Sequence, residues 1–243
     1  MRRVVVAGGE PELAVLLELF PQGVEELPDG FAVYTDDEGE RQLRERFDVT
    51  SEPFAEGWEE AWREFHHGLV VGRLWIGPPW ERAEADVTPV IVDPGRAFGT
   101  GAHATTRLSL ELLQEAEPTS LLDVGCGSGV LAIAAAKIGF APVVAVDVEQ
   151  DAVETTLANA RVNGVDLTAY RADALADDLP AAGLVTANIA LGAVRRVLAR
   201  IDAPRAIVSG YLDRDELEVA GWRRVERCDR EGWAADLLER ELS

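Results

Sequence analysis

The stretch "LLDVGCGSGV", residues 121–130, places an acid near the end of an apolar run and three glycines directly after it. The apolar run reads as a buried strand, and the alanine-rich "GVLAIAAAKIG" that follows reads as a helix. Glycines in such a turn let the backbone approach a ligand closely, and the start of the helix offers unpaired N–H groups. The stretch therefore predicts a binding turn between a strand and a helix.

Strands and helices continue to alternate after this turn. Residues 142–148, 167–173, 183–189 and 205–211 read as strands, and residues 149–164, 191–201 and 213–221 read as helices. Such alternation is typical of a parallel, doubly wound sheet. Residues 222–241 break it and read as two strands around a turn. We therefore expect an α/β fold: a doubly wound, mostly parallel, seven-stranded sheet that ends in an antiparallel hairpin.

The front of the chain has a different pattern. Residues 1–51 read as strand–helix–strand–strand–helix–strand, the order of a small ferredoxin-like α+β module. Trp58, Trp62 and Phe65 then recur at helical spacing, and we interpret this stripe as packing between two modules rather than as a ligand site. The predicted organisation is a small α/β module at 1–52, a linker helix and hinge at 53–80, and the large domain at 81–243.

Composition excludes several classes of protein. The chain has only two cysteines, Cys126 and Cys228, and three histidines, so we expect a reducing, cytoplasmic setting and no metal site. No apolar run is long enough to span a bilayer, and no secretory signal is recognisable, so no membrane partner is expected. The net charge of −21 argues against direct binding of nucleic acid. It suits a basic protein partner, or it serves solubility alone.

The ligand class follows from the acids near the binding turn. The spacing G-x-G-x-G, made by Gly125, Gly127 and Gly129, differs from the G-x-G-x-x-G of dinucleotide sites. Asp123 would repel a pyrophosphate and would suit a cationic amino group. Asp147 ends the next strand, 22 residues after Gly125, where it can accept both hydroxyls of a ribose. A nucleoside with an ammonium group and no phosphate is S-adenosyl-L-methionine, which we predict as the cofactor.

Two later strand ends complete the predicted pocket. Asp173 lies where the adenine amino group is expected, although a solvated loop acid is the alternative reading. Asn188 ends the fourth strand, at the edge where open α/β sheets perform chemistry. Methyltransferases that act on exocyclic amines often carry N-P-P-[YF] at this edge, whereas this chain has Asn188-Ile189-Ala190-Leu191. Without the proline pair and the aromatic ring, a flexible aliphatic amine is the favoured acceptor.

The stretch "DPGRAFGTGAHATTR", residues 93–107, together with "DVGCGSGVLAIAA" and "TANI", resembles the PrmA family of bacterial ribosomal protein methyltransferases. That family belongs to the class I S-adenosylmethionine-dependent methyltransferases and modifies the eleventh protein of the large ribosomal subunit. The resemblance is clear over residues 89–243, and residues 1–88 match mainly in layout. It implies an S-adenosylmethionine-dependent protein N-methyltransferase that acts on lysine side chains, on the N-terminal amine, or on both.

The resemblance also assigns residues. It implies that Thr106, Gly125, Asp147 and Asn188 contact the cofactor, and that the loop before the helix closes over the methionine end. We expect the loop to contribute Phe98, Gly99, Thr100 and Thr105, with Phe98 covering the sulfonium by cation–π attraction. We expect catalysis to involve Asn188, Ile189 and His103, where His103 orients the loop or acts as a base.

The implied partner is a basic ribosomal protein, taken before or apart from ribosome assembly, and the enzyme is expected to be a monomer. In the family the front module recognises the substrate, and residues 1–72 hold 17 acids against 6 arginines, which suits a basic partner. One rival reading is a methyltransferase for another protein or a small amine. A second is a non-catalytic protein that binds the same cofactor.

Overall fold

The computed structural model describes residues 2–9, 12, 15–16, 19–20, 24–27, 30–53, 67–83, 86–93 and 103–241. The chain divides into two compact units, Met1–Phe65 and His66–Ser243. Each unit has its own apolar core. The predicted binding residues that the structure describes all belong to the second unit.

The first unit is a four-stranded antiparallel sheet with a helix packed against it. Its strands are β1 (Arg2–Ala7), β2 (Glu25–Leu27), β3 (Gly30–Thr35) and β4 (Val49–Pro53), in the order β2-β3-β1-β4. Helix α2 (Asp37–Arg44) begins where the Asp36 carboxylate accepts from the Glu38 and Gly39 amides. Val4, Val6, Leu16 and Leu43 form the centre of the core. This strand order is the ferredoxin-like arrangement that the sequence predicted.

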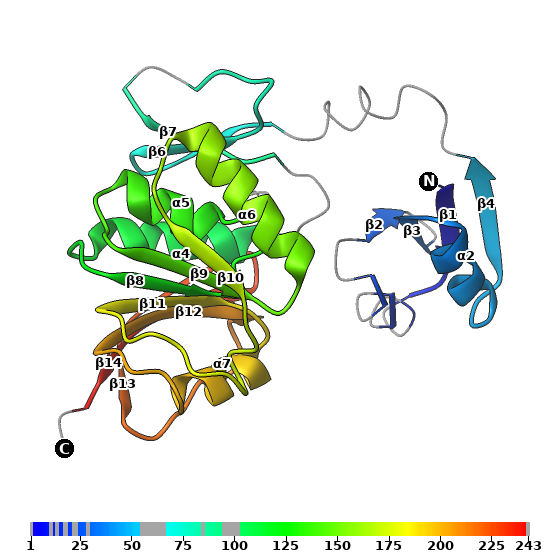
Figure 1. Cartoon of the computed structure of the whole chain (residues 1–243). Coiled ribbons are helices and arrows are strands. Elements are labelled where there is room, and N and C mark those ends of the chain that lie inside the picture. The colour runs from blue at the N-terminus through cyan, green and yellow to red at the C-terminus, as the bar shows by residue number, and fades with distance from the viewer. Residues whose placement is uncertain are drawn as a thin grey trace. The chain divides into compact units, whose positions relative to one another are not determined.

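The second unit is built on the predicted seven-stranded sheet, shown in green to red in Figure 1. Its order is β10-β9-β8-β11-β12-β14-β13, and the pairs among the first five strands are parallel. The last two strands are antiparallel, as expected for the terminal hairpin. The strands are β8 (Leu121–Val124), β9 (Val143–Asp147), β10 (Thr168–Arg171), β11 (Leu184–Asn188), β12 (Arg205–Leu212), β13 (Trp222–Arg230) and β14 (Trp233–Arg240).

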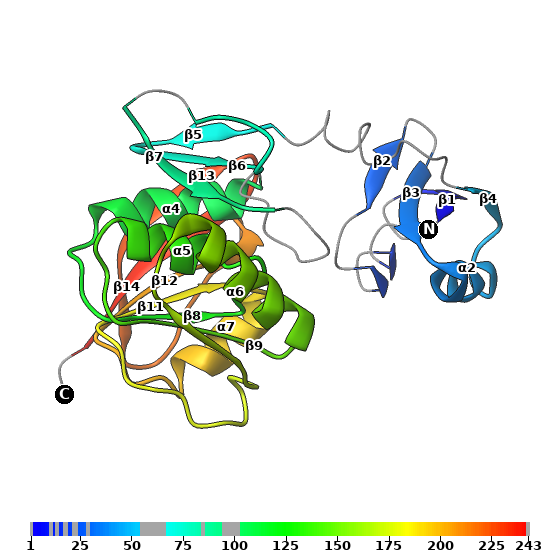
Figure 2. The same ribbon diagram turned by 45° about the horizontal axis from the view of Figure 1, so that its top comes forward.

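Helices cover both faces of this sheet (Figures 1 and 2). On one face lie α4 (Ala104–Glu115), α5 (Val130–Lys137) and α6 (Gln150–Asn163), and on the other lies α7 (Leu191–Leu198). Two separate apolar clusters match this division, one containing residues of α4 and α5 and the other containing residues of α7. The six residues Val130–Ala135 of α5 are all buried, because this helix packs against the sheet and is flanked by α4 and α6.

A second, three-stranded sheet lies where the sequence suggested part of a linker. Strands β5 (Leu69–Val71), β6 (Leu74–Gly77) and β7 (Thr88–Ile91) pair in the order β5-β6-β7 and belong to the second unit. Gln114 of α4 fastens the β5–β6 turn, since its carboxamide accepts from the Arg73 amide and donates to the Val71 carbonyl. The predicted helix with Trp58, Trp62 and Phe65 lies outside the described residues.

The prediction of a helix at 213–221 is wrong, because residues 215–219 have no regular secondary structure and lie between turns at 213–214 and 220–221. Three carbonyl groups of this segment accept from arginine side chains rather than from amides four residues along the chain. Arg227 donates to the carbonyls of Asp213 and Asp215, and Arg195 donates to that of Glu216. These bonds to distant residues replace the helical ladder.

Candidate active site

The predicted binding residues gather at one edge of the seven-stranded sheet. β8 lies between β9 and β11, because the chain runs from β8 outward through β9 to β10 on one side and then crosses back to β11 on the other side. The carboxyl ends of β8, β9 and β11 carry Asp123, Asp147 and Asn188. Ligands in open α/β sheets bind at such a switch point.

The turn after β8, residues 125–129 (the glycine turn), has a backbone that only glycine adopts easily. Gly125, Gly127 and Gly129 have φ values of +73°, +53° and +82°. A Cβ atom on Gly125 would come within 2.5 Å of the Ile189 Cγ2. The turn is closed by the Gly129 amide, which donates to the Cys126 carbonyl at 2.7 Å. The absence of a side chain at Gly125 therefore lets the turn approach Ile189, which follows β11 directly.

Asp147 connects the glycine turn to the next strand end. One carboxylate oxygen accepts from the Gly127 amide at 3.0 Å, and the other accepts from the Glu149 amide at 3.0 Å. Each oxygen keeps a second lone pair, so the carboxylate can still accept from a ligand hydroxyl. The half-buried carboxylate therefore keeps acceptor capacity beyond its two backbone hydrogen bonds.

Asp123 lies beneath the turn and is buried. Thr186 of β11 donates to one of its carboxyl oxygens at 2.7 Å, and among the described residues the other oxygen accepts no hydrogen bond of normal geometry. Burial is the main cause that raises the pKa of Asp123 to about 6. Hydrogen bonding to Thr186 and to the Ala132 backbone limits this rise, and the Asp147 carboxylate adds a smaller contribution to it. The oxygen that Thr186 does not contact is an acceptor in a site that already carries negative charge, which favours a cationic group nearby.

Asn188 and Thr106 approach each other from separate elements. The Asn188 side-chain amide, at the end of β11, donates to the Thr106 hydroxyl in the first turn of α4 at 3.3 Å. The next residue, Ile189, packs its side chain toward Gly125 and donates its amide to the Ser209 carbonyl. Thus the start of α4, the glycine turn and the end of β11 meet at one place.

His103 is the N-cap residue of α4. Its Nδ1 accepts from the Thr105 amide and lies 2.8 Å from the Thr105 hydroxyl, while its ring packs edge-on against Trp233. Burial lowers the pKa of His103, and Arg107 lowers it further. The neutral ring that results has an acceptor at Nδ1, and that atom is committed to the helix start. This contact supports the orienting role over the role of a base.

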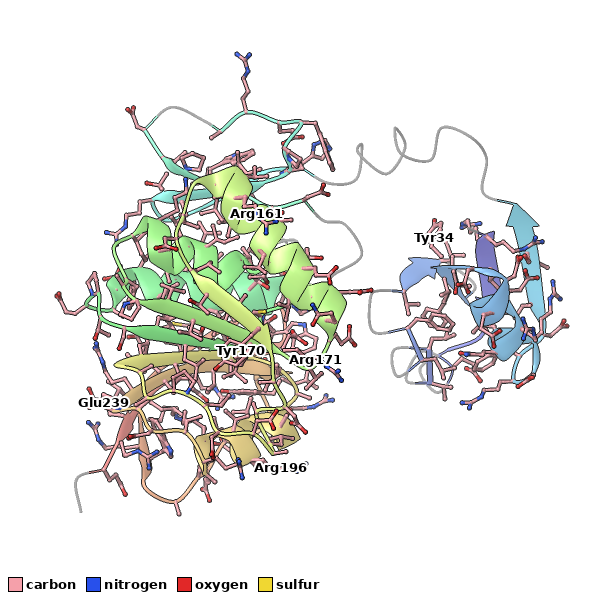
Figure 3. The ribbon with its side chains drawn as sticks, in the orientation of Figure 1. Tyr34, Arg161, Tyr170, Arg171, Arg196 and Glu239 are labelled. Carbon is pink, nitrogen blue, oxygen red and sulfur yellow. The ribbon has the colours of Figure 1, made fainter. Side chains whose placement is uncertain are left out.

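Three of the predicted loop residues, Phe98, Gly99 and Thr100, lie outside the described residues. Asp173 is exposed, and its carboxylate accepts from the Leu175 amide in a local turn. Sequence reasoning did not single out Val148, whose side chain is 54% exposed directly after Asp147. Arg171 of β10, labelled in Figure 3, donates to the Val148 carbonyl at 2.8 Å. The signal that could have found Val148 is an apolar residue directly after a strand-end acid.

The chemical character of these groups suits S-adenosylmethionine. The two acids attract a cation, the three glycines of the turn admit a nucleoside, and Val148 offers apolar surface for a base. Among the described residues there is no cluster of three or more His, Cys, Asp or Glu side chains that could hold a metal ion. Within the same part of the chain, no helix is both long and apolar enough to cross a bilayer.

Comparison with known proteins gives one consistent family. The family model described as ribosomal protein L11 methyltransferase (PrmA) matches residues 29–240. A ribosomal protein L11 methyltransferase from Aliivibrio salmonicida is 41% identical over 176 residues, which cover 68% of this chain and 60% of that protein. One from Shewanella pealeana is 42% identical over 164 residues, covering 64% and 54%. The match therefore spans less than two thirds of the length of these relatives.

Solved structures give the same fold. A ribosomal protein L11 methylase from Lactobacillus delbrueckii subsp. bulgaricus superposes with a TM-score of 0.63 and 29% identity, covering 72% of this chain and 100% of that one. A putative RNA methyltransferase from Pyrococcus horikoshii superposes with a TM-score of 0.50 and 18% identity, covering 61% and 88%, and is similar in fold alone.

Proposed function

The chain belongs to the ribosomal protein L11 methyltransferase (PrmA) family, and on that premise we propose that it methylates amino groups of ribosomal protein L11 with S-adenosylmethionine as donor. The acceptors in this proposal are lysine side chains, the N-terminal amine, or both. The observation that carries it is the meeting of the glycine turn, the Asp147 carboxylate and Asn188 at one sheet edge.

The donor would lie across this edge in an order set by the strand ends. The Asp147 carboxylate would accept from the ribose hydroxyls, Val148 would pack on the adenine, and Asp173 would reach its amino group. The Asp123 oxygen that Thr186 does not contact would attract the ammonium group. Thr105 and Thr106 would face the methionine end, together with Phe98, Gly99 and Thr100 of the loop.

The cofactor supplies an electrophilic methyl group on a cationic sulfur. The protein has to align a lone pair of the acceptor amine with that methyl group, which is mainly a task of orientation. A lysine ammonium, with a free pKa of about 10.4, must first lose its proton, and transfer into a dry pocket lowers that pKa. Asn188 would then hold the amine through its side-chain and neighbouring carbonyl oxygens, and Ile189 would exclude water at the glycine turn.

The first unit is proposed to bind the substrate protein. Described acids on it include Asp36, Asp37, Glu38 and Glu45, and a basic ribosomal protein would be attracted to such a surface. This part of the proposal depends on charge, so weakening of substrate binding by salt is its signature.

Mass spectrometry tests the proposed reaction directly. The full chain is incubated with isotopically labelled S-adenosylmethionine and free ribosomal protein L11, and the products are digested and read peptide by peptide. Label on lysine-containing or N-terminal peptides is the expected result. Donor binding without label on L11 would favour the rival reading of a different amine substrate. Donor binding without transfer to any protein or amine would favour a non-catalytic role.

The raised pKa of Asp123 predicts a pH dependence of donor binding. With a pKa of about 6, only about a quarter of this carboxyl is ionised at pH 5.5, and nearly all is ionised at pH 7.5. A cationic donor prefers the ionised form, so its affinity should rise about fourfold between these pH values. Titration calorimetry measures the change. Asp123→Asn should bind more weakly at pH 7.5 and should lose the pH dependence, and an unchanged profile in this variant would contradict the role.

A further inference from the structure

Helix α6 buries polar side chains on the face that meets the glycine turn. Thr156, Asn159 and Asn163 follow one another at helical spacing, and each is less than 9% exposed. Figure 3 labels Arg161, an exposed residue of the same helix. A buried polar side chain is retained only where hydrogen bonds satisfy it. The partners of these three residues therefore indicate what the face does.

The first two of them hold consecutive carbonyls of the glycine turn. The Thr156 hydroxyl donates to the Gly127 carbonyl at 3.1 Å, and the Asn159 side-chain amide donates to the Ser128 carbonyl at 2.9 Å. A Cβ atom on Gly129 would meet Thr156 atoms at 2.9–3.1 Å, so the turn and the helix are in close contact. These bonds fix the orientation of two peptide planes in the turn.

The other end of the Asn159 carboxamide reaches a separate segment. Its oxygen accepts from the Asp93 amide at 3.1 Å. One turn further along α6, the Asn163 carboxamide pairs with Ile91 in β7, accepting from its amide at 2.9 Å and donating to its carbonyl at 2.6 Å. Both asparagines therefore hold the end of β7, and of the two only Asn159 also holds the glycine turn.

We propose that Asn159 is a positioning residue of the donor site, which sets the spacing between the glycine turn and the backbone at Asp93. This inference rests on the proposed function, because it assigns a role in binding the same donor. Asn159 is not one of the residues predicted to contact the methyl donor. It acts through the Ser128 carbonyl on one side and the Asp93 amide on the other, with segments 31 and 66 residues away in sequence.

Asn163 provides a matched control on the same helix. Asn159→Ala and Asn163→Ala each remove a buried carboxamide that makes hydrogen bonds to backbone, so both should lower the urea midpoint of unfolding by a similar amount. Affinity for S-adenosylhomocysteine, measured by titration calorimetry, should separate them. We expect Asn159→Ala to weaken it about fivefold, which corresponds to one lost hydrogen bond, and Asn163→Ala to leave it within about twofold.

Asn159→Asp separates the effects of the two hydrogen bonds that the carboxamide makes, one to the Asp93 amide and one to the Ser128 carbonyl. The carboxylate can still accept from the Asp93 amide but cannot donate to the Ser128 carbonyl. Amide hydrogen exchange in the donor-free protein should therefore be unchanged at Asp93 in this variant, whereas Asn159→Ala should speed exchange there. Affinity for the methyl donor should fall in both variants, because both lose the hydrogen bond to the Ser128 carbonyl of the glycine turn.

The outcomes distinguish this inference from the proposed function. If the unaltered chain binds neither S-adenosylmethionine nor S-adenosylhomocysteine, the proposed function fails and takes this inference with it. If the unaltered chain binds them and the two alanine variants bind equally well, or are weakened equally, only the positioning role of Asn159 is overturned. Weaker donor binding in Asn159→Ala alone, with faster exchange at Asp93, supports it.

Discussion

Replacing Asn188 with alanine should lower the turnover number about 100-fold while donor affinity changes less than about threefold. Asn188 lies at the end of β11 and donates to the Thr106 hydroxyl, so its side chain is fixed between two elements. If it holds the acceptor amine, its loss leaves the donor bound but the amine unaligned. A misplacement of about 1 Å is enough for an effect of this size.

Single-turnover kinetics on ribosomal protein L11, with calorimetry for S-adenosylhomocysteine, separates the two quantities for Asn188→Ala. Thr106→Val is the companion variant, since it removes the hydroxyl that accepts from Asn188 and leaves Asn188 in place. We expect a smaller loss of turnover for Thr106→Val, accompanied by weaker donor binding. Equal losses of turnover and donor affinity in Asn188→Ala would refute its catalytic role.

The seven-stranded sheet was predictable because each strand and helix carries its own local pattern. Apolar runs such as 121–124 and 183–189 have a polar residue, Asp123 or Asn188, next to their last position, and helices with regular apolar spacing separate the runs. The structure has this sheet, mostly parallel and with the antiparallel terminal hairpin that was expected. The glycine turn, Asp123 and Asp147 were predictable for the same reason, because each lies at or directly after the end of a strand that has its own local pattern.

The misread segments are those in which contacts distant in sequence decide the structure. Strands β5 and β6 are three and four residues long, and their docking depends on Gln114 in α4. Two β-branched or aromatic runs around Gly72 were the available hairpin signal. At 213–221 the sequence has helical character, but arginines from β13 and α7 occupy its carbonyls. No local pattern reveals those partners.

The roles of buried polar residues are likewise hidden from sequence. Asn159 and Asn163 read as ordinary helix residues, and their partners lie 31 to 72 positions away. Asp123 was predicted at the site, but its burial and its bond to Thr186 depend on the pairing of β8 with β11. Placement of a side chain within a predicted element therefore required the tertiary structure.

Replacing Gly129 with alanine should cost about 3 kcal/mol of folding stability and weaken donor binding at least about 20-fold, whereas Gly164→Ala should cost about 1 kcal/mol and leave donor binding unchanged. Both glycines lie on left-handed backbone, with φ values of +82° and +63°, so both substitutions carry the strain of that conformation. An added Cβ on Gly164 would meet no described atom within 4 Å outside its own helix and its chain neighbours.

The difference between the two variants isolates the contact between the glycine turn and α6. An added Cβ on Gly129 would lie 3.1 Å from the Cα of Thr156, and a backbone atom cannot move aside as a flexible side chain would. The turn must shift instead, and with it the Gly127 amide that Asp147 holds. Urea unfolding and calorimetry of both variants measure the two losses. If Gly129→Ala lost no more stability than Gly164→Ala, the turn would have room to relax, and the fixed geometry on which donor binding is argued to depend would be absent.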